Sequence, residues 1–152
     1  MNPPFRAEHI GSFFRPANLL QARAAHDSGK LSAAELRTVE DAAIADFIRL
    51  QEDLGFKVVT DGELRRGTYT GNFTTGGISG VTAEVVGEGE WLYSDSSGHK
   101  VKARLPAVHD RIRWKESRNL PEFTFLKTHT KATPKLTMPG PCYIHFRAGR
   151  AR

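Results

Sequence analysis

The sequence has a single cysteine and no long apolar run, and each absence removes a class of protein. Cys142 has no partner for an internal disulfide, so a disulfide-rich secreted domain is excluded and a reducing, cytoplasmic setting is expected. No stretch of about 18 consecutive apolar residues occurs, so we expect no membrane-spanning helix. Residues 1–6 lack an apolar core, so we expect no signal peptide.

Motifs for nucleotide and metal binding are also scarce. There is no P-loop and no Gly-x-Gly-x-x-Gly that opens a helix after a strand. Cys142 and His145 are close in sequence to His129, but a structural zinc site needs four ligands and a catalytic one needs three. We therefore expect no metal site built from this chain alone.

The chain of 152 residues carries 22 basic and 17 acidic residues, and 39% of it is hydrophobic. This composition predicts one globular domain. The excess of positive charge falls in residues 81–152, and it predicts either an anionic partner or a solvated basic surface. Basic residues surround an aromatic one at Arg111, Arg113, Trp114, Lys115 and Arg118. Such a mixture occurs in single-strand nucleic-acid binders, but a charge-protected hairpin edge is the favoured interpretation.

The first half of the chain predicts two helices and a buried strand. Pro16 suits the first turn of a helix that Gly29 ends. Ser32 and Glu35 form a capping box that opens a second helix, and Gly55 ends it. Its apolar positions recur at spacings of three and four, at Leu36, Val39, Ala43, Phe47, Leu50 and Leu54. Residues 56–60 do not alternate in polarity, which predicts a fully buried strand.

The other segments are assigned from composition and periodicity. They are a short strand and turn at 8–13, a Gly- and Thr-rich loop at 67–80, antiparallel hairpin strands at 81–115, a helix or strand at 121–130, a strand at 135–139, and a turn at 140–141.

Candidate functional residues lie at two places, each at the end of a short apolar segment. Asp61 and Glu63 follow the buried strand, in the position where βα barrels present active-site groups. Such carboxylates can hold an ammonium group, act as acid or base, or bind a metal. The alternative is that they cap the next helix and pair with Arg65 or Arg66.

The second place is the segment that contains His9, Gly11 and Ser12. A glycine there would let a ligand approach the backbone, and its amide could hold a carboxylate. The alternative is an ordinary tight turn.

Three ordered segments together resemble a known family. Residues 9–16 (HIGSFFRP), 51–66 (QEDLGFKVVTDGELRR) and 135–141 (KLTMPGP) are similar to segments of the catalytic barrel of cobalamin-independent methionine synthase. The first two look closest to the short, single-barrel bacterial members.

The resemblance implies an α/β fold, a partial TIM-like (β/α)8 barrel with a β-hairpin insertion at 81–118. Since a full barrel needs roughly 250 residues, we expect residues 1–152 to be the N-terminal portion of one barrel domain, inactive by itself. The implied activity is transfer of a methyl group from 5-methyltetrahydrofolate, which can be polyglutamylated, to a homocysteine-type thiol in methionine biosynthesis. Zinc is implied as the thiol's activator, with its ligands expected beyond residue 152.

By position, the resemblance implies that Ile10, Gly11 and Ser12 hold the backbone end of the amino acid and that Glu63 holds its ammonium group. His9, Asp61 and Arg15 are further candidates, and Asp61 stands where the two-barrel enzymes carry a histidine. Small-molecule thiol and folate are the expected partners, without membrane or nucleic acid. Two alternatives stay open: a zinc-dependent alkyltransferase for another thiol, and a basic, non-enzymatic binding module.

Overall fold

The computed structural model describes residues 7–67, 77–85, 93–94, 100–101, 104–117, 119–140 and 142. The chain divides into two compact units. One contains residues 1–69 and 119–137, and the other contains residues 70–118 and 138–152. No helix in the described residues is both long and apolar enough to cross a bilayer.

Two helices open the first unit, α1 at Ala17–Asp27 and α2 at Ala33–Asp53. Pro16 caps α1 rather than lying within it. The predicted capping box is confirmed, because the Glu35 amide donates to Ser32 Oγ at 3.2 Å and the Ser32 amide donates to Glu35 Oε2 at 2.8 Å. Gly55 follows the end of α2 with φ 82°, a left-handed conformation that suits glycine at this position.

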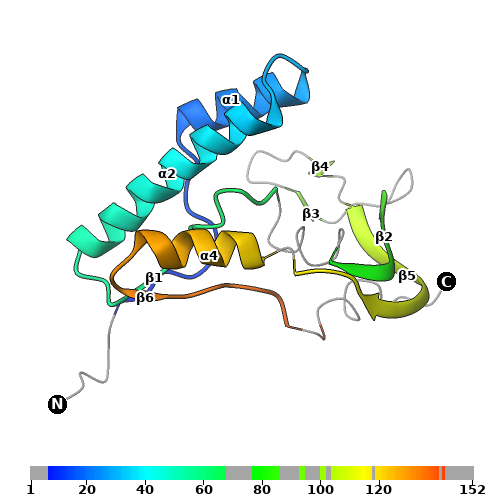
Figure 1. The fold of residues 1–152 in the computed structure, drawn as a ribbon. Helices are drawn as coiled ribbons and strands as arrows, with labels where there is room; N and C mark the ends of the chain where they lie inside the picture. The colour runs from blue at the N-terminus through cyan, green and yellow to red at the C-terminus, as the bar shows by residue number, and fades with distance from the viewer. Residues whose placement is uncertain are drawn as a thin grey trace. The chain divides into compact units, whose positions relative to one another are not determined.

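A short parallel strand pair completes this unit. Strand β1 at Val58–Val59 pairs with β6 at Thr133–Pro134, with Val59 opposite Pro134. Helix α4 at Leu120–His129 precedes β6, so the segment expected to be a helix or a strand is a helix. Figure 1 shows α2 packing against both α1 and α4.

Two predicted strands are wrong. Residues 8–13 form no strand, because Gly11 adopts φ 87° and interrupts the extended backbone. The third strand lies at 133–134 instead of 135–139. The Lys135 amide still donates to the Val59 carbonyl at 2.8 Å. Because β1 ends at Val59, the residues after Lys135 have no further β1 residue to pair with.

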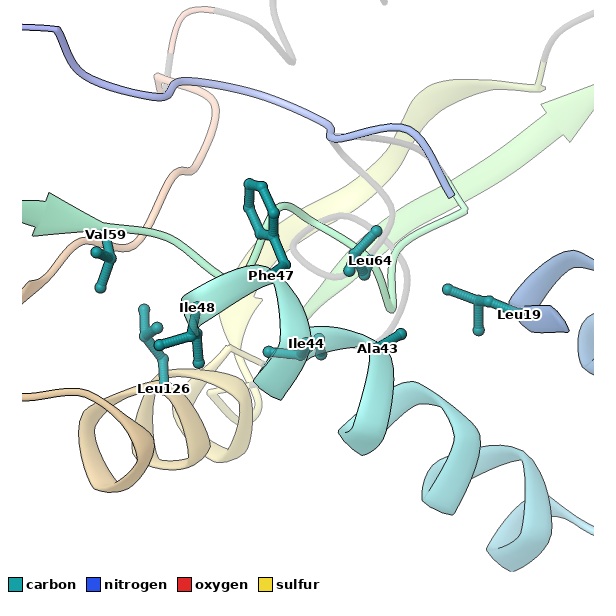
Figure 2. Packing of buried hydrophobic residues seen from close by; sticks show 8 residues of the cluster. All are labelled: Leu19, Ala43, Ile44, Phe47, Ile48, Val59, Leu64 and Leu126. Carbon is teal, nitrogen blue, oxygen red and sulfur yellow. The ribbon is translucent and has the colours of Figure 1, made fainter. Parts of the chain in front are cut away.

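The core of the first unit is built on one face of α2. Figure 2 shows Ile44 and Ile48 of α2 near Leu126 of α4, with Val59 of β1 beside them. The full cluster is Leu19, Ala43, Ile44, Phe47, Ile48, Val59, Leu64 and Leu126. The predicted apolar stripe is right for Ala43 and Phe47 but wrong at its C-terminal end.

Leu50 and Leu54 are 43% and 67% exposed, whereas Ile44, Ile48 and Gln51 are buried. The buried stripe therefore follows the 3.6-residue repeat through Gln51, a polar residue that an apolar pattern does not reveal.

The second unit contains antiparallel strands, as predicted. β2 at Ile78–Val85 pairs with β5 at Arg104–Trp114, and β3 at Tyr93–Ser94 pairs with β4 at Lys100–Val101. β2 begins inside the segment predicted as a loop, of which residues 68–76 lie outside the described residues. The β2–β5 ladder shifts register between Ser79 and Val81. Between them Gly80 has φ 81°, and a Cβ there would lie 2.7 Å from two carbonyl oxygens of β5. The interpretation of residues 81–118 as a hairpin insertion stays a prediction.

The loop between α4 and β6 is held by the carboxylate of Glu52. Its Oε1 accepts from the Thr130 hydroxyl at 2.6 Å and from the Lys131 amide at 3.0 Å. These donors favour the ionised form and lower the pKa of Glu52. A lowered pKa contributes stability that is present above the ordinary glutamate pKa and is lost as the pH falls through the lowered value.

We predict that Glu52→Gln lowers the free energy of unfolding at pH 7 by about 1 kcal/mol, because a partly exposed charged acceptor is replaced by a neutral one. The difference between the two proteins should shrink as the pH falls below about 4.5, the ordinary pKa of the group. Urea unfolding at pH 7 and pH 3 measures it. Asp53→Asn, at the exposed next position, is the control. An equal difference at both pH values would contradict the assigned role.

Candidate functional site

The turn at residues 61–66 begins where β1 ends, and the side chain of Gln51 fixes its start. Gln51 Nε2 donates to the Thr60 carbonyl at 2.9 Å, and the Thr60 amide donates to Gln51 Oε1 at 3.0 Å. Gln51 is 2% exposed and also donates to the Phe47 carbonyl at 3.2 Å. The amide group of Gln51 thus hydrogen-bonds the main chain of Thr60, which pairs with no strand among the described residues, and it ties the turn to α2.

Within the turn, two consecutive residues adopt the left-handed conformation. Gly62 has φ 63° and Glu63 has φ 54°. A Cβ on Gly62 would lie 2.7 Å from the Phe47 ring, so α2 passes too close for any side chain. A left-handed glutamate is costly, and such strain concentrates at functional sites.

The carboxylate of Glu63 lies at the meeting point of three segments that are far apart in the sequence. The Ser12 hydroxyl donates to its Oε2 at 3.1 Å, and the Thr137 hydroxyl donates to its Oε1 at 2.8 Å. The Glu63 residue is 4% exposed. The turn after β1, the N-terminal segment and the segment after β6 therefore converge on one carboxylate.

Arg66 compensates the negative charge of this carboxylate. Its Nη1 lies 3.7 Å from Glu63 Oε1 and donates to the Thr137 carbonyl at 2.8 Å. Its Nε donates to Glu122 Oε2 of α4 at 3.4 Å. Arg66 is 2% exposed, and a buried charge requires partners of this kind. The alternative, in which the carboxylates cap a following helix and pair with Arg65 or Arg66, is met only in part. Glu63 pairs with Arg66, but residues 61–67 form no helix, and Arg65 pairs with Asp41 and Glu40 of α2.

The N-terminal segment reaches the site through main-chain and aromatic contacts. The Phe13 amide donates to the Gly62 carbonyl at 2.9 Å, and the Phe13 ring stacks on Phe47 at 4.1 Å. Ser12 is thereby brought to Glu63. The side chain of Ile10 points away from the core, since this residue is 76% exposed. Any contribution of Ile10 and Gly11 to a ligand would come from their main chain.

His9 serves the local structure of this segment. Its Nε2 lies 2.9 Å from the Gly11 carbonyl oxygen, and its ring meets the edges of the Phe13 and Phe47 rings. A role for His9 toward a ligand stays a prediction.

Asp61 shapes the turn with one of its oxygens. Oδ1 accepts from the Glu63 amide at 3.0 Å, while Oδ2 is buried and has no hydrogen-bond partner among the described residues. The residue is 3% exposed. Asp61 therefore supports Glu63, and a direct role toward a ligand stays a prediction.

Arg15 and Arg23 lie beside the same turn. Arg15 Nη2 donates to the carbonyl of Arg66 at 2.7 Å and faces that of Glu63 at 3.4 Å, and Arg23 donates to the carbonyl of Leu64. Burial lowers the pKa of Arg15, and the nearby charge of Arg23 lowers it further. Arg23 also pairs with Glu40 at 3.5 Å, and burial raises the pKa of that carboxyl.

Sequence reasoning assigned no role to Gln51, Thr137 or Glu122. Gln51 and Thr137 stand inside the segments that carry the family resemblance, and that is the one signal that singles them out. Glu122 lies in a segment of ambiguous structure, 56 positions from its partner Arg66, so nothing local points to it.

The described residues do not fit the zinc that the resemblance implies. Among them, no group of three or more His, Cys, Asp or Glu side chains is placed to hold a metal ion. Cys142 is exposed, and the ring of His129 stacks on Phe125. His145 lies outside the described residues. Zinc ligands elsewhere in a longer protein stay a prediction.

The described residues also include a hollow in the first unit and a group of basic and aromatic residues in the second. A hollow of about 250 Å³ adjoins the start of β1, not its end, and is lined by Ala7, Glu8, Leu54, Gly55, Phe56, Lys57 and Val58. In the second unit, the basic and aromatic residues of 111–115 are exposed on β5 and just after it, and Arg118 lies outside the described residues. Their exposure is what a charge-protected hairpin requires, and that interpretation is retained.

Comparison with known proteins gives consistent matches. A family model described as "Cobalamin-independent synthase, Catalytic domain" matches residues 5–145. The uncharacterized protein YxjH of Bacillus subtilis (strain 168) is 34% identical over 144 residues, which cover 94% of this chain and 37% of the relative. A 5-methyltetrahydropteroyltriglutamate–homocysteine methyltransferase of a Synechococcus strain is 29% identical over 139 residues, which cover 91% of this chain and 18% of the relative.

Solved structures agree. The crystal structure of a putative vitamin-B12-independent methionine synthase from Listeria monocytogenes matches with a TM-score of 0.70 and 28% identity, over 95% of this chain and 39% of that one. A B12-independent methionine synthase from a Shewanella species, in complex with selenomethionine, matches with a TM-score of 0.57 and 22% identity, over 78% of this chain and 33% of that one. At this identity the match supports the fold alone. The chain thus spans less than two fifths of the length of these relatives.

We predict that Gly62→Ala lowers the free energy of unfolding by about 2–4 kcal/mol, because its methyl group must displace the Phe47 ring and the alanine must adopt a positive φ. Gly29→Ala is the matched control, since Gly29 has φ 74° but nothing within 4 Å of its built Cβ. It should lose only about 1 kcal/mol, the cost of the conformation. Equal losses in urea unfolding would show that the contact with Phe47 is unimportant.

Proposed function

This chain belongs to the family of the cobalamin-independent methionine synthase catalytic domain, and from that premise we propose that it holds the amino-acid end of a thiol substrate during methyl transfer. The methyl donor proposed is 5-methyltetrahydrofolate, in simple or polyglutamylated form, and the acceptor is a homocysteine-type thiol. The product class is then a methionine-type thioether.

The observation that carries this proposal is the convergence of Ser12 and Thr137 on the carboxylate of Glu63. Each oxygen of Glu63 accepts one hydroxyl hydrogen bond, at 3.1 Å and 2.8 Å. A carboxylate oxygen accommodates about two acceptor interactions, so each keeps capacity for a further donor. An ammonium group carries three N–H donors and a full positive charge, and it suits this remaining capacity.

The surroundings of Glu63 favour a charged ligand over a neutral one. The site is shielded from water, and charge-assisted hydrogen bonds are about twice as strong as neutral ones. Arg66 is shared between Glu63 and Glu122, and Arg15 is a further positive charge near Glu63. A ligand ammonium would give the Glu63 carboxylate a cationic partner in direct hydrogen-bond contact, which Arg66 at 3.7 Å does not.

The opposite end of the amino acid is assigned to the main chain of residues 10–12. The Phe13 amide is used by the Gly62 carbonyl. Within the described part of the chain, the amides of Ile10, Gly11 and Ser12 have no hydrogen-bond partner. Gly11 has no side chain and lets a carboxylate approach these amides closely. The ammonium end of one amino acid would thus lie at Glu63 and its carboxylate end at the main chain of residues 10–12.

We predict that Glu63→Gln weakens binding of L-methionine by about 10- to 100-fold, the loss expected when a charge-assisted hydrogen bond is removed. The measurement is a titration followed by NMR, with the amides of Ser12, Glu63 and Thr137 as reporters. Asp46→Asn, in an exposed ion pair of α2, is the control and should bind normally. Unchanged affinity in Glu63→Gln, or no binding by the natural chain, would contradict the proposal.

We also predict that the site prefers thiols that carry an amino-acid group. L-Homocysteine should displace L-methionine at concentrations where 2-sulfanylethanesulfonate does not, because the sulfonate lacks an ammonium for Glu63. Competition titrations with both thiols measure this preference. Stronger binding of the sulfonate would favour the alternative of an alkyltransferase for a different thiol and would leave Glu63 without its proposed partner.

A further inference from the structure

The left-handed conformation of Glu63 needs an external support, because the chain itself does not favour it. A non-glycine residue at φ 54° costs about 1–2 kcal/mol relative to a right-handed one. Such a residue persists only where the surrounding contacts determine its conformation. One such contact is the hydrogen bond from the Glu63 amide to Asp61 Oδ1 at 3.0 Å, and others involve the carbonyl groups of the same turn.

Three carbonyl groups of the turn face two arginines. Arg15 precedes α1, and Arg23 lies within it. Arg15 Nη2 donates to the Arg66 carbonyl at 2.7 Å and approaches the Glu63 carbonyl at 3.4 Å. Arg23 donates to the Leu64 carbonyl and approaches the Arg66 carbonyl at 3.5 Å. The Glu63 carbonyl also accepts from the Arg66 amide at 3.0 Å, so the two guanidinium groups add donors to a turn that already has a main-chain hydrogen bond.

Packing holds α1 against the turn. Leu19 is fully buried in the same cluster as Leu64 (Figure 2). Because Leu19 and Arg23 are four residues apart, they share one face of α1. Arg23 is fixed in turn by Glu40 of α2. The apolar contact sets the position of α1, and the arginines then fix the carbonyl directions of the turn.

We propose that Arg15 is a positioning residue that holds the backbone of Glu63 in its left-handed conformation and so directs the Glu63 carboxylate toward the ligand ammonium. The part that concerns the ligand rests on the proposed function, whereas the part that concerns the backbone does not. Arg15 acts through Glu63 and is not assigned a contact with the ligand.

The backbone part is tested by the stability of variants at both positions. Arg15→Gln should lower the thermal midpoint by about 3–6 °C in the natural chain and also in an E63Q background, where residue 63 is still left-handed but uncharged. In an E63G background the loss should be under about 2 °C, because glycine adopts positive φ without support. An equal loss in all three backgrounds would overturn the proposal, and E63Q separates the backbone effect from the charge of Glu63.

The ligand part is tested with L-methionine and 4-(methylthio)butanoate, which lacks the ammonium group. Arg15→Gln should weaken L-methionine binding about tenfold and change binding of the analogue less than about twofold, because a displaced Glu63 affects only ammonium recognition. Arg15→Lys keeps a positively charged donor group without the planar guanidinium and should recover part of the lost affinity. Arg49→Gln, in an exposed ion pair, is the control.

The outcomes separate the two hypotheses. An equal loss for both ligands would mean that Arg15 is merely structural, and it would overturn the positioning role. If the natural chain binds neither ligand, the proposed function fails, while the stability comparison still decides whether Arg15 supports the backbone of Glu63.

Discussion

The site depends on the paired hydrogen bonds between Gln51 and the main chain of Thr60. They determine where β1 ends and where the turn begins. The amide and the carbonyl of Thr60 find their hydrogen-bond partners in a side chain of α2 instead of in a neighbouring strand. The close passage of Phe47 over Gly62, one helical turn earlier on α2, follows from the same attachment. A buried polar side chain thereby connects the longest described helix, α2, to the turn at residues 61–66.

Around this turn, acidic and basic side chains alternate in space. Glu40 lies between Arg23 and Arg65, and Arg66 lies between Glu63 and Glu122. Buried ion pairs contribute little net stability, since desolvation offsets much of their attraction. Their effect here is directional: each guanidinium has a fixed geometry and restricts where the neighbouring carboxylate and carbonyl groups can lie.

The sequence predicted features that depend on local chemistry. The capping box at Ser32, the extent of α2 and the position of β1 all follow from nearby residues. The strand expected at 8–13 failed because a left-handed glycine interrupts it, and the buried stripe was misplaced at Leu50 and Leu54 because Gln51 is a polar core residue. The family resemblance assigned Ser12 and Glu63 to two ends of one ligand, and it did not predict their direct hydrogen bond. Thr137 was not assigned, because 74 residues separate it from Glu63 and no local pattern connects them.

The pairing of β1 with β6 has a consequence for the outer edge of that strand pair. Thr133 and Lys135 direct their amides to β1, at 3.0 Å and 2.8 Å. The residue between them, Pro134, would direct its amide to the opposite edge, but proline has no N–H. An incoming strand on that edge therefore meets a position that offers no donor. Among the described residues no strand pairs with that edge. Proline at such an edge restricts indiscriminate strand addition, and a strand added there would need a register that tolerates the missing donor.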